Sequence, residues 1–569
     1  MTKANKPEPN TAARDQSDIV EQATDNILGP NPFIGLRSED ILASFQALGQ
    51  QAMANPGLVV EQEAALIRDL ISVLSGEADF APPKGDKRFN DGAWTNNPFY
   101  RATLQGYLAW TKALHGFVDR STLDERTKER TRFAMSLVTD AFAPTNMLLG
   151  NPAALNKTWE TRGANLVAGM RNLIADMTEN GGMPAQVDKK AFTIGKNLAL
   201  SPGMVVFRNP VLELIQYSST TSTVYSRPHI VVPPEINKFY VFDLAPGRSI
   251  VEYLVAHGLQ MFVVSWRNPT AAERNWGMDA YVSALLEAIA AVRDITGSDD
   301  VVIHAACSGA MTAAALAGYF ATKGDTTIHA MTLMVAVLGE TDGALGLFVT
   351  PETAAAAKEA SHTKGILDGT DMNRIFAWLR PNDLVWNYWV NNYLMGNDPP
   401  VFDILYWSND STRLPARFHG ELIDMFSHNL FLKPGAMKVL GEPIDLGKVV
   451  FDKFFVAGVT DHITPWKGVY GAARAFGGRN DFILSASGHI QSLINPPGNP
   501  KAKFFVNPDL VSSPDDWLRQ ASSTTGSWWE PWRVWAAERS GEMRPAPTSP
   551  GSDRYKPLEK APGSYVLEK

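Results

Sequence analysis

The only cysteine of the chain, Cys307, lies where a short apolar strand would turn into a helix. The β-branched run at 301–303 precedes it, as in a strand that is buried on both faces. Small residues surround it in the stretch Ala305-Ala306-Cys307-Ser308-Gly309, and the alanine-rich run at 311–316 has strong helix propensity. Strand, tight turn and helix form the layout of a nucleophile elbow, which holds a reactive side chain exposed at the top of a sheet. The sequence therefore predicts that Cys307 is a nucleophile.

Two further residues that could do chemistry follow strand-like runs nearer the C-terminus. Asp461 comes after the run at 454–457, and His489 comes after the run at 482–485. Nucleophile, acid and histidine in this chain order are typical of α/β hydrolases, and the carboxyl ends of parallel strands meet at the edge where an elbow projects. A thiol with a reference pKa of about 8.5 needs a base, which an imidazole supplies while a carboxylate fixes its tautomer. We predict a triad of Cys307, His489 and Asp461.

Two neighbours compete for these roles. Ser308 is one step past the apex of the elbow, so its hydroxyl should point elsewhere. His462 is adjacent to Asp461, but a base there could not receive an acid from the preceding strand in the usual order. A lone cysteine is more often a small buried apolar residue than a nucleophile, and here the ordered partners favour catalysis.

An oxyanion hole would stabilise the tetrahedral intermediate of acyl transfer. The backbone N–H of Ser308 is the first expected donor, and the loop after the strand at Val231 should supply the second. Pro233 and Pro234 have no N–H, so Glu235, Ile236 and Asn237 remain. Ile236 is the working candidate, and the choice among the three stays open.

The sequence pattern predicts a mainly helical part of the chain followed by an α/β part that positions these residues. Residues 1–30 are rich in Pro, Asn and charge and are expected to be disordered. Helical periodicity predicts a mainly helical N-terminal domain over 31–200. From about 205, strand-like runs alternate with helices, which favours a parallel sheet. The fold class is thus α/β, an α/β-hydrolase fold over 201–569 with an aromatic cap insertion at about 340–441.

Composition excludes several classes of protein. The 569 residues are 45% hydrophobic and 20% charged, with a net charge of −8, which argues against nucleic acid as a partner. One cysteine excludes an intrachain disulfide and fits a reducing compartment. The N-terminus has no apolar core of a signal peptide, and no apolar run approaches the roughly 20 residues of a membrane span, so we expect a cytoplasmic protein.

Aromatic residues allow two interpretations. The tryptophans of the SWWEPWRVW segment could touch an apolar surface, but packing against the core is favoured: Trp528, Trp529, Trp532 and Trp535. The aromatic set between Trp386 and Trp407 could line an acyl channel, form a subunit contact or pack in the core.

Long blocks of the sequence resemble the polyhydroxyalkanoate synthases. They include VVPPEINKFYVFDLAPGRS, SWRNPT, RPNDLVWNYWVNNYLMGNDPPVFDILYWSNDSTRLP, GVTDHITPW and SGHIQSLINPPGNPK, and the similarity runs from about residue 30 almost to the end. It is closest to class II, the medium-chain-length branch. The family pattern at the elbow is G-x-C-x-G-G, and this chain has Ala305 and Ala310 in place of two of the glycines.

The resemblance implies polymerisation of (R)-3-hydroxyacyl-CoA into polyester with release of CoA. It assigns Cys307 as the carrier of the acyl thioester and His489 as the base, while Asp461 either orients His489 or helps to activate the 3-hydroxyl. It implies no cofactor, since the CoA thioester is the substrate, a place on the polyester granule surface, and a homodimer with Trp407 as a candidate contact. The alternatives are a cysteine-dependent α/β hydrolase that cleaves esters or thioesters, and an inactive granule-binding protein.

Overall fold

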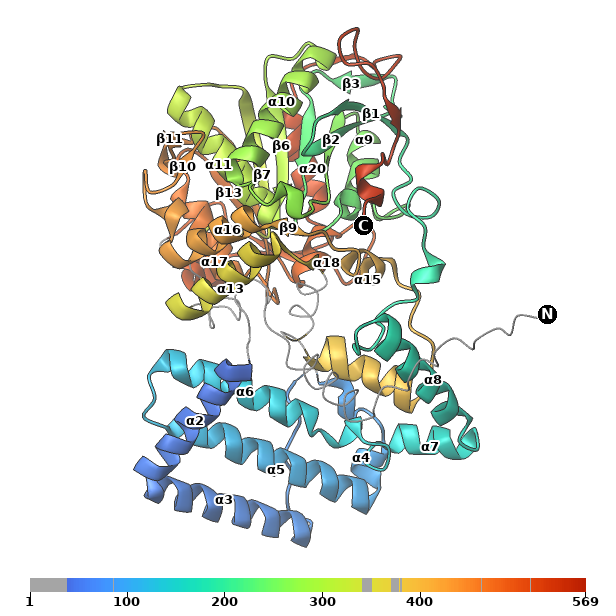
Figure 1. Ribbon diagram of the computed structural model, residues 1–569, viewed down its shortest axis with the longest axis vertical. Helices are drawn as coiled ribbons and strands as arrows, with labels where there is room; N and C mark the ends of the chain where they lie inside the picture. The colour runs from blue at the N-terminus through green and yellow to red at the C-terminus, as the bar shows by residue number, and fades with distance from the viewer. Residues whose placement is uncertain are drawn as a thin grey trace, which may run out of the picture. The chain divides into compact units, whose positions relative to one another are not determined.

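The computed structural model of the chain describes residues 38–84, 86–339, 350–369, 378, 381–461, 463–511 and 513–569 (Figure 1). The chain forms two compact units. The first takes in Leu36–Gln186 and Arg380–Pro399, and the second Val187–Leu379 and Pro400–Lys569. The expected disordered segment 1–30, the start of the expected cap at 340–349 and the rival base His462 lie outside the described residues.

The first unit is helical, as the periodicity predicts. Its α-helices are α2 (Ser38–Ala54), α3 (Pro56–Ser75), α4 (Ala93–Asn96), α5 (Pro98–Arg120), α6 (Glu125–Ala141), α7 (Pro152–Glu160) and α8 (Ala164–Glu179). Helix α5 starts at a proline, and the Asn97 side chain before it accepts hydrogen bonds from the backbone N–H groups of its first turn. Leu104 and Leu108 on one face of α5 are buried with Trp94 in the core of this unit.

Part of the expected cap clusters with these helices. Two π-helical segments, Asn382–Trp386 and Trp389–Leu394, lie within Arg380–Pro399. The Tyr393 hydroxyl donates to Oδ2 of Asp176 over 2.8 Å, and the Asn392 amide donates to the carbonyl of Ala185 over 2.7 Å. The segment Arg380–Pro399 therefore packs on the first unit, with Tyr393 bonded to helix α8, while Pro400 onward clusters with the second unit.

The second unit is built around one large mixed sheet. The strand order among the described residues is β15-β14-β13-β12-β7-β6-β4-β5-β2-β1-β17. The strands are β1 (Gly203–Arg208), β2 (Leu212–Tyr217), β4 (His229–Val232), β5 (Met261–Trp266), β6 (Val301–Ala306), β7 (Ile328–Met334), β12 (Asp452–Gly458), β13 (Asn480–Ser485), β14 (Lys503–Val506), β15 (Ser522–Thr525) and β17 (Glu559–Lys560).

The centre of this sheet is parallel, as predicted, and its edges are not. The pairs from β5 through β4, β6, β7 and β12 to β13 are parallel, whereas β14, β15, β1, β2 and β17 pair antiparallel. The strand-like run that begins near Val205 becomes the hairpin β1–β2. The Asn209 side chain accepts hydrogen bonds from the backbone N–H groups of Val211 and Leu212, which turns the chain between the two strands.

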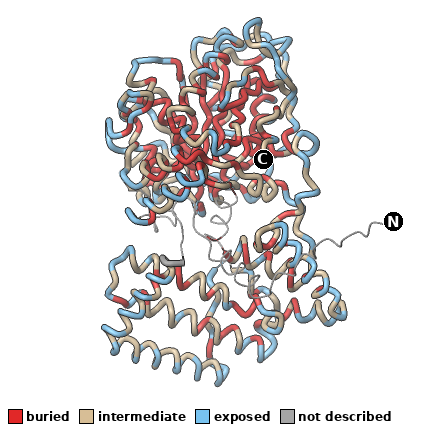
Figure 2. The backbone as a smooth tube through the Cα atoms, viewed as in Figure 1, coloured by how far each residue is buried: buried red, intermediate tan, exposed pale blue. Residues whose placement is uncertain are grey.

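Helices cover both faces of the sheet (Figure 1). Helices α10 (Met278–Thr296), α11 (Cys307–Lys323) and α17 (Trp466–Ala475) pack on one face, to which β6 contributes Ile303 and Ala305. Helices α9 (Ile250–Val255) and α20 (Trp529–Glu538) pack on the other face with Val302 and Ala306. Buried residues are concentrated along these strands (Figure 2). Successive residues of β6 therefore face opposite sides of the sheet, and helices cover both sides. This explains why the strand begins with a continuous apolar run.

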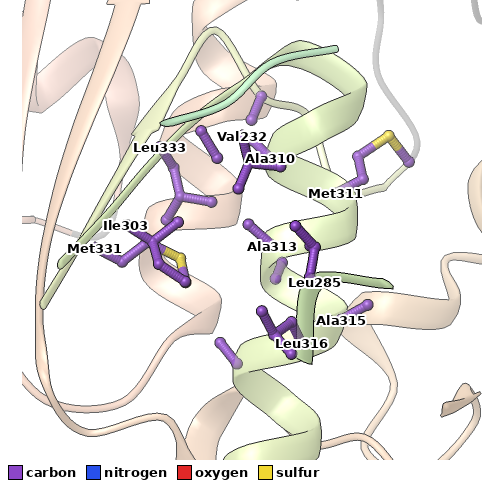
Figure 3. Packing of buried hydrophobic residues seen from close by; sticks show 14 of the residues in the cluster. Val232, Leu285, Ile303, Ala310, Met311, Ala313, Ala315, Leu316, Met331 and Leu333 are labelled. Atoms are coloured by element: carbon purple, nitrogen blue, oxygen red, sulfur yellow. The ribbon is translucent and has the colours of Figure 1, made fainter. Parts of the chain in front are cut away.

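Helix α11 packs closely on the sheet because its buried face is made largely of alanine. Ala310 and Ala313 lie on the side of α11 that faces the strand residues Ile303 and Leu333 (Figure 3). Small side chains let a helix axis come near a sheet, so the start of α11 is held firmly.

The rest of the second unit surrounds this core. Its further elements are β3 (Thr223–Tyr225), α13 (Pro351–Lys364), β8 (Ile366–Leu367), α15 (Asp403–Ser408), β9 (Leu414–Pro415), α16 (Ala416–His428), β10 (Lys438–Val439), β11 (Glu442–Pro443), α18 (His489–Leu493), α19 (Pro514–Gln520) and β16 (Met543–Pro545). Trp528, Trp529, Trp532 and Trp535 are all buried, which confirms the packing interpretation. No helix in the described part of the chain is long and apolar enough to span a membrane.

Candidate active site

The predicted elbow is present at the junction of β6 and α11. Strand β6 ends at Ala306 and the helix begins at Cys307, whose φ of 51° lies in the left-handed region. A residue other than glycine costs roughly 1–2 kcal/mol in that conformation. The cysteine is half-buried, so it remains partly accessible at the end of the strand. A strained, accessible cysteine at this junction is what a nucleophile elbow requires.

Gly309 allows the elbow to approach the loop after β4. A Cβ at this position would lie 2.3 Å from the carbonyl oxygen of Pro233, and that oxygen already accepts a hydrogen bond from the Trp266 indole over 2.7 Å. By contrast, Ala305 and Ala310 are fully buried among core residues and neither has a positive φ. Their methyl groups therefore fill core space without straining the backbone, although the family pattern has glycine at both positions.

The acid and the histidine meet behind two neighbouring strands. Asp461 follows β12 and His489 follows β13, and these strands are parallel with Gly458 opposite Ser485. Nδ1 of His489 lies 2.7 Å from Oδ2 of Asp461, and both residues are buried. The sequence prediction that strand order would bring these two side chains together is confirmed by this distance.

Asp461 is held by more contacts than the sequence suggested. Its Oδ1 accepts hydrogen bonds from the backbone N–H groups of Ile463 (2.9 Å) and Thr464 (2.8 Å), and its Oδ2 accepts one from the Thr464 hydroxyl (2.6 Å). Burial alone would raise the pKa of Asp461, but the charge of His489 and these hydrogen bonds lower it below its usual value. Thr464 was missed; the only sequence signal for it is a threonine three residues after an aspartate, typical of an Asx turn.

His489 is set up to hold a proton next to the thiol. Its Nδ1 faces Asp461, so Nε2 is the ring nitrogen left to exchange a proton, and Cys307 lies near enough to raise the pKa of the ring. Burial opposes the charged imidazolium, but Asp461 and Cys307 outweigh it and raise the pKa of His489 to about 10. An imidazolium beside a thiol favours the thiolate, which is the nucleophilic form of cysteine.

The geometry narrows the choice of oxyanion donor. The N–H of Glu235 donates to the Ser308 hydroxyl oxygen over 3.1 Å, so it is already used. The same bond turns the Ser308 side chain toward the loop after β4, as expected of a residue past the apex. The backbone N–H of Ser308 lies in the first turn of α11, where helix N–H groups have no intrahelical acceptor. Ile236 and Asn237 remain as second donors.

Trp407, expected as a candidate subunit contact, is buried in the second unit. Its indole N–H donates to the carbonyl of Lys238 over 2.7 Å. The side chain thus anchors the loop that carries Ile236 and Asn237, and does not face outward.

Comparisons with known proteins agree with this architecture. One family model, described as the N-terminus of poly-beta-hydroxybutyrate polymerase (PhaC), matches residues 85–254, and a model of the alpha/beta hydrolase fold matches 242–496. Poly(3-hydroxyalkanoate) polymerase 1 of Ectopseudomonas oleovorans is 49% identical over 98% of this chain and 100% of its own length. Polymerase 2 of the same organism is 46% identical over 94% and 96%. The polymerase subunit PhaC of Cupriavidus necator is 38% identical over 88% and 86%. The second unit has the α/β-hydrolase fold, and the chain belongs to the poly(3-hydroxyalkanoate) polymerases, acyltransferases that synthesise a polyester.

Proposed function

We propose that the chain polymerises (R)-3-hydroxyacyl-CoA through a covalent thioester on Cys307, with release of CoA. The observation that carries this proposal is the strained Cys307 at the elbow, beside a histidine whose Nδ1 lies 2.7 Å from Oδ2 of Asp461. The greater identity to the two Ectopseudomonas oleovorans polymerases than to the Cupriavidus necator subunit supports the class II, medium-chain-length assignment.

The first half-reaction loads the enzyme. The Cys307 thiolate attacks the carbonyl carbon of the acyl-CoA, and a tetrahedral oxyanion forms within reach of the Ser308 N–H and the second donor. The intermediate collapses with cleavage of the bond between carbon and the CoA sulfur, and CoA leaves with a proton from His489. One thioester replaces another, so the acyl group stays activated.

The second half-reaction extends the polymer. The 3-hydroxyl of another acyl group attacks the thioester carbonyl and gives its proton to His489. An oxygen–carbon bond forms, the carbon–sulfur bond to Cys307 breaks, and the thiolate is regenerated. A thiolate is a good leaving group, which is why cysteine suits this transfer.

We assign Asp461 to orienting His489. Its two oxygens accept four hydrogen bonds, from Ile463, Thr464 and His489, and this leaves little capacity for a substrate hydroxyl. In this role the carboxylate fixes the tautomer of His489 and stabilises its cation.

Substitution of the nucleophile tests the proposal. Purified Cys307→Ala, incubated with a medium-chain (R)-3-hydroxyacyl-CoA, should release CoA at least 1,000-fold more slowly than the parent chain, the order of loss seen when a nucleophile is removed. Free thiol and product size are followed together, and thermal melting checks the fold. Polymer at the parent rate from this variant would overturn the proposal. Free hydroxy acid without polymer from the parent chain would favour the cysteine-dependent hydrolase instead.

We also propose that the enzyme needs no cofactor and acts as a homodimer in the cytoplasm at the surface of polyester granules. These assignments rest on the resemblance to the family. Activity that survives dialysis against a chelator, a dimer by sedimentation, and recovery of the chain with granules on a density gradient would support them. A monomer that polymerises at the full rate would exclude the dimer requirement.

A further inference from the structure

Glu235 joins the loop after β4 to two other parts of the second unit. It is buried, with 2% of its surface exposed. Its N–H donates to the Ser308 hydroxyl, and its Oε1 accepts a hydrogen bond from the Thr312 hydroxyl over 2.6 Å. Both partners belong to helix α11, which begins with the nucleophile. Its carbonyl accepts a hydrogen bond from the hydroxyl of Thr412, a buried residue between α15 and β9.

Thr412 fixes two consecutive peptide groups of this loop. Its hydroxyl binds the carbonyl of Glu235, and its backbone N–H donates to the carbonyl of Ile236 over 3.2 Å. A trans peptide is planar, so the carbonyl of one residue and the N–H of the next point in opposite directions. The first bond therefore sets the direction of the Ile236 N–H, and the second sets that of the Asn237 N–H. These are the two N–H groups that remain as second oxyanion donors.

The carboxyl of Glu235 accepts its hydrogen bond from the Thr312 hydroxyl, and among the described residues it forms no salt bridge. Burial raises its pKa, and the hydroxyls of Ser308 and Thr312 only partly oppose this. Burial raises the pKa of Tyr281 as well, and the field of this carboxyl adds to that shift. The contact with Thr312 therefore needs an acceptor oxygen rather than a negative charge, and the amide of glutamine offers the same oxygen.

We propose that Glu235 and Thr412 are positioning residues that orient the second oxyanion donor toward the acyl group on Cys307. The inference rests on the proposed function, since an oxyanion forms only if Cys307 attacks the acyl carbonyl. Neither residue touches the reacting atoms. Glu235 ties the donor loop to the nucleophile helix, and Thr412 ties its peptide planes to the segment after α15.

Paired variants separate this role from a general effect on folding. Thr412→Val keeps the shape of the side chain and removes its hydroxyl, whereas Thr412→Ser keeps the hydroxyl. Removal of a direct oxyanion donor costs about 100- to 1,000-fold in kcat, so a misdirected donor should cost about 10- to 100-fold. We expect that loss in kcat for CoA release, with KM changed less than threefold, in Thr412→Val and not in Thr412→Ser. Glu235→Leu should show the same loss in kcat, and Glu235→Gln, which keeps the acceptor oxygen, should not.

Alkylation of Cys307 by iodoacetamide provides the second readout. This reaction needs the thiolate but forms no oxyanion, and Cys307 is the only cysteine in the chain. Its rate should change less than threefold in all four variants, with thermal melting as the check on folding. A Thr412→Val enzyme that keeps its kcat, or that loses alkylation and CoA release by the same factor, overturns the proposal. If Thr412→Val does not fold, the Glu235 pair decides it by the same criteria. Failure of Cys307→Ala to stop CoA release would instead refute the proposed function.

Discussion

A pair of buried histidines should make the second unit sensitive to acid. His229 on β4 and His304 on β6 are fully buried, with Nδ1 of His229 2.8 Å from Nε2 of His304. Nε2 of His229 lies 2.8 Å from the Ser540 hydroxyl oxygen, and that hydroxyl donates to the carbonyl of Ala536 over 2.6 Å. Ser540 has no second proton to give, so His229 must donate from Nε2 and accept at Nδ1.

The other end of the chain of hydrogen bonds agrees with this assignment. If His229 accepts at Nδ1, His304 donates from Nε2 and must accept at its own Nδ1, which lies 3.0 Å from the Thr332 hydroxyl. The Thr332 oxygen in turn accepts from the Trp532 indole N–H over 2.9 Å. Every donor has an acceptor only when both imidazoles are neutral. A proton added to His229 would place two donors face to face, and a proton added to His304 would take away the acceptor of the Thr332 hydroxyl.

The loss of folding stability at low pH follows from the burial and hydrogen bonds of these two rings. Burial lowers the pKa of His304 to about 3, and burial together with the field of His304 lowers that of His229 well below its usual value. The unfolded chain takes up a proton at each ring near pH 6.5, and the folded chain does not. Stability is therefore present above pH 6.5 and lost as the pH falls, by up to 1.36 kcal/mol per pH unit and ring. Between pH 7 and pH 5 the two rings together should cost about 4 kcal/mol.

The double variant His229→Gln/His304→Gln tests this magnitude. Urea unfolding is followed by tryptophan fluorescence at pH 7 and pH 5, because Trp532 packs edge-on to His304 with ring centroids 5.0 Å apart. The parent chain should lose about 4 kcal/mol more than the variant between the two pH values. Other titrating groups, including His489, contribute equally to both proteins and cancel. Equal losses within about 1 kcal/mol would refute the assignment of two neutral buried rings.

Two further variants test the elbow and the triad. Gly309→Ala should lower the free energy of unfolding by about 1–3 kcal/mol through its collision with Pro233, whereas Gly471→Ala, with open space around its Cα, should be neutral or stabilising; equal melting temperatures for the two would contradict this. Asp461→Asn should lower the pKa of His489 and slow CoA release by about 10,000-fold, with alkylation of Cys307 slowed as well. An alkylation rate that stays unchanged across the pH profile would show that Asp461 does not support the thiolate.

Local and topological signals account for the features that were predictable from the sequence. The apolar run before Cys307 and the alanines after it are local patterns, and they correctly placed β6 and α11. Asp461 and His489 were found because parallel strands bring their carboxyl ends to one edge, whatever the length of chain between them. The antiparallel edges of the sheet were harder to predict, because β14 and β15 are short and show no strong alternation of apolar and polar residues.

The contacts that orient the oxyanion loop had no such signal. Glu235 bonds to Ser308, 73 residues away, and to Thr412, 177 residues away. A threonine between two elements is ordinary in any sequence, and a glutamate after two prolines would be taken for a solvated loop residue. Only the fold shows that this carboxyl is buried against hydroxyls and that one threonine holds two peptide planes.

The two halves of the candidate site therefore depend on different supports. Activation of the thiol rests on Asp461 and His489 behind β12 and β13, whereas orientation of the oxyanion donor rests on Glu235 and Thr412 behind β4. Both halves meet at helix α11, which begins with Cys307 and carries Ser308 and Thr312. Loss of Asp461 should slow both alkylation and CoA release, while loss of the Thr412 hydroxyl should slow CoA release alone. Because one cysteine reports both rates in the same protein, the ratio of the two losses separates preorganisation of the oxyanion hole from activation of the nucleophile.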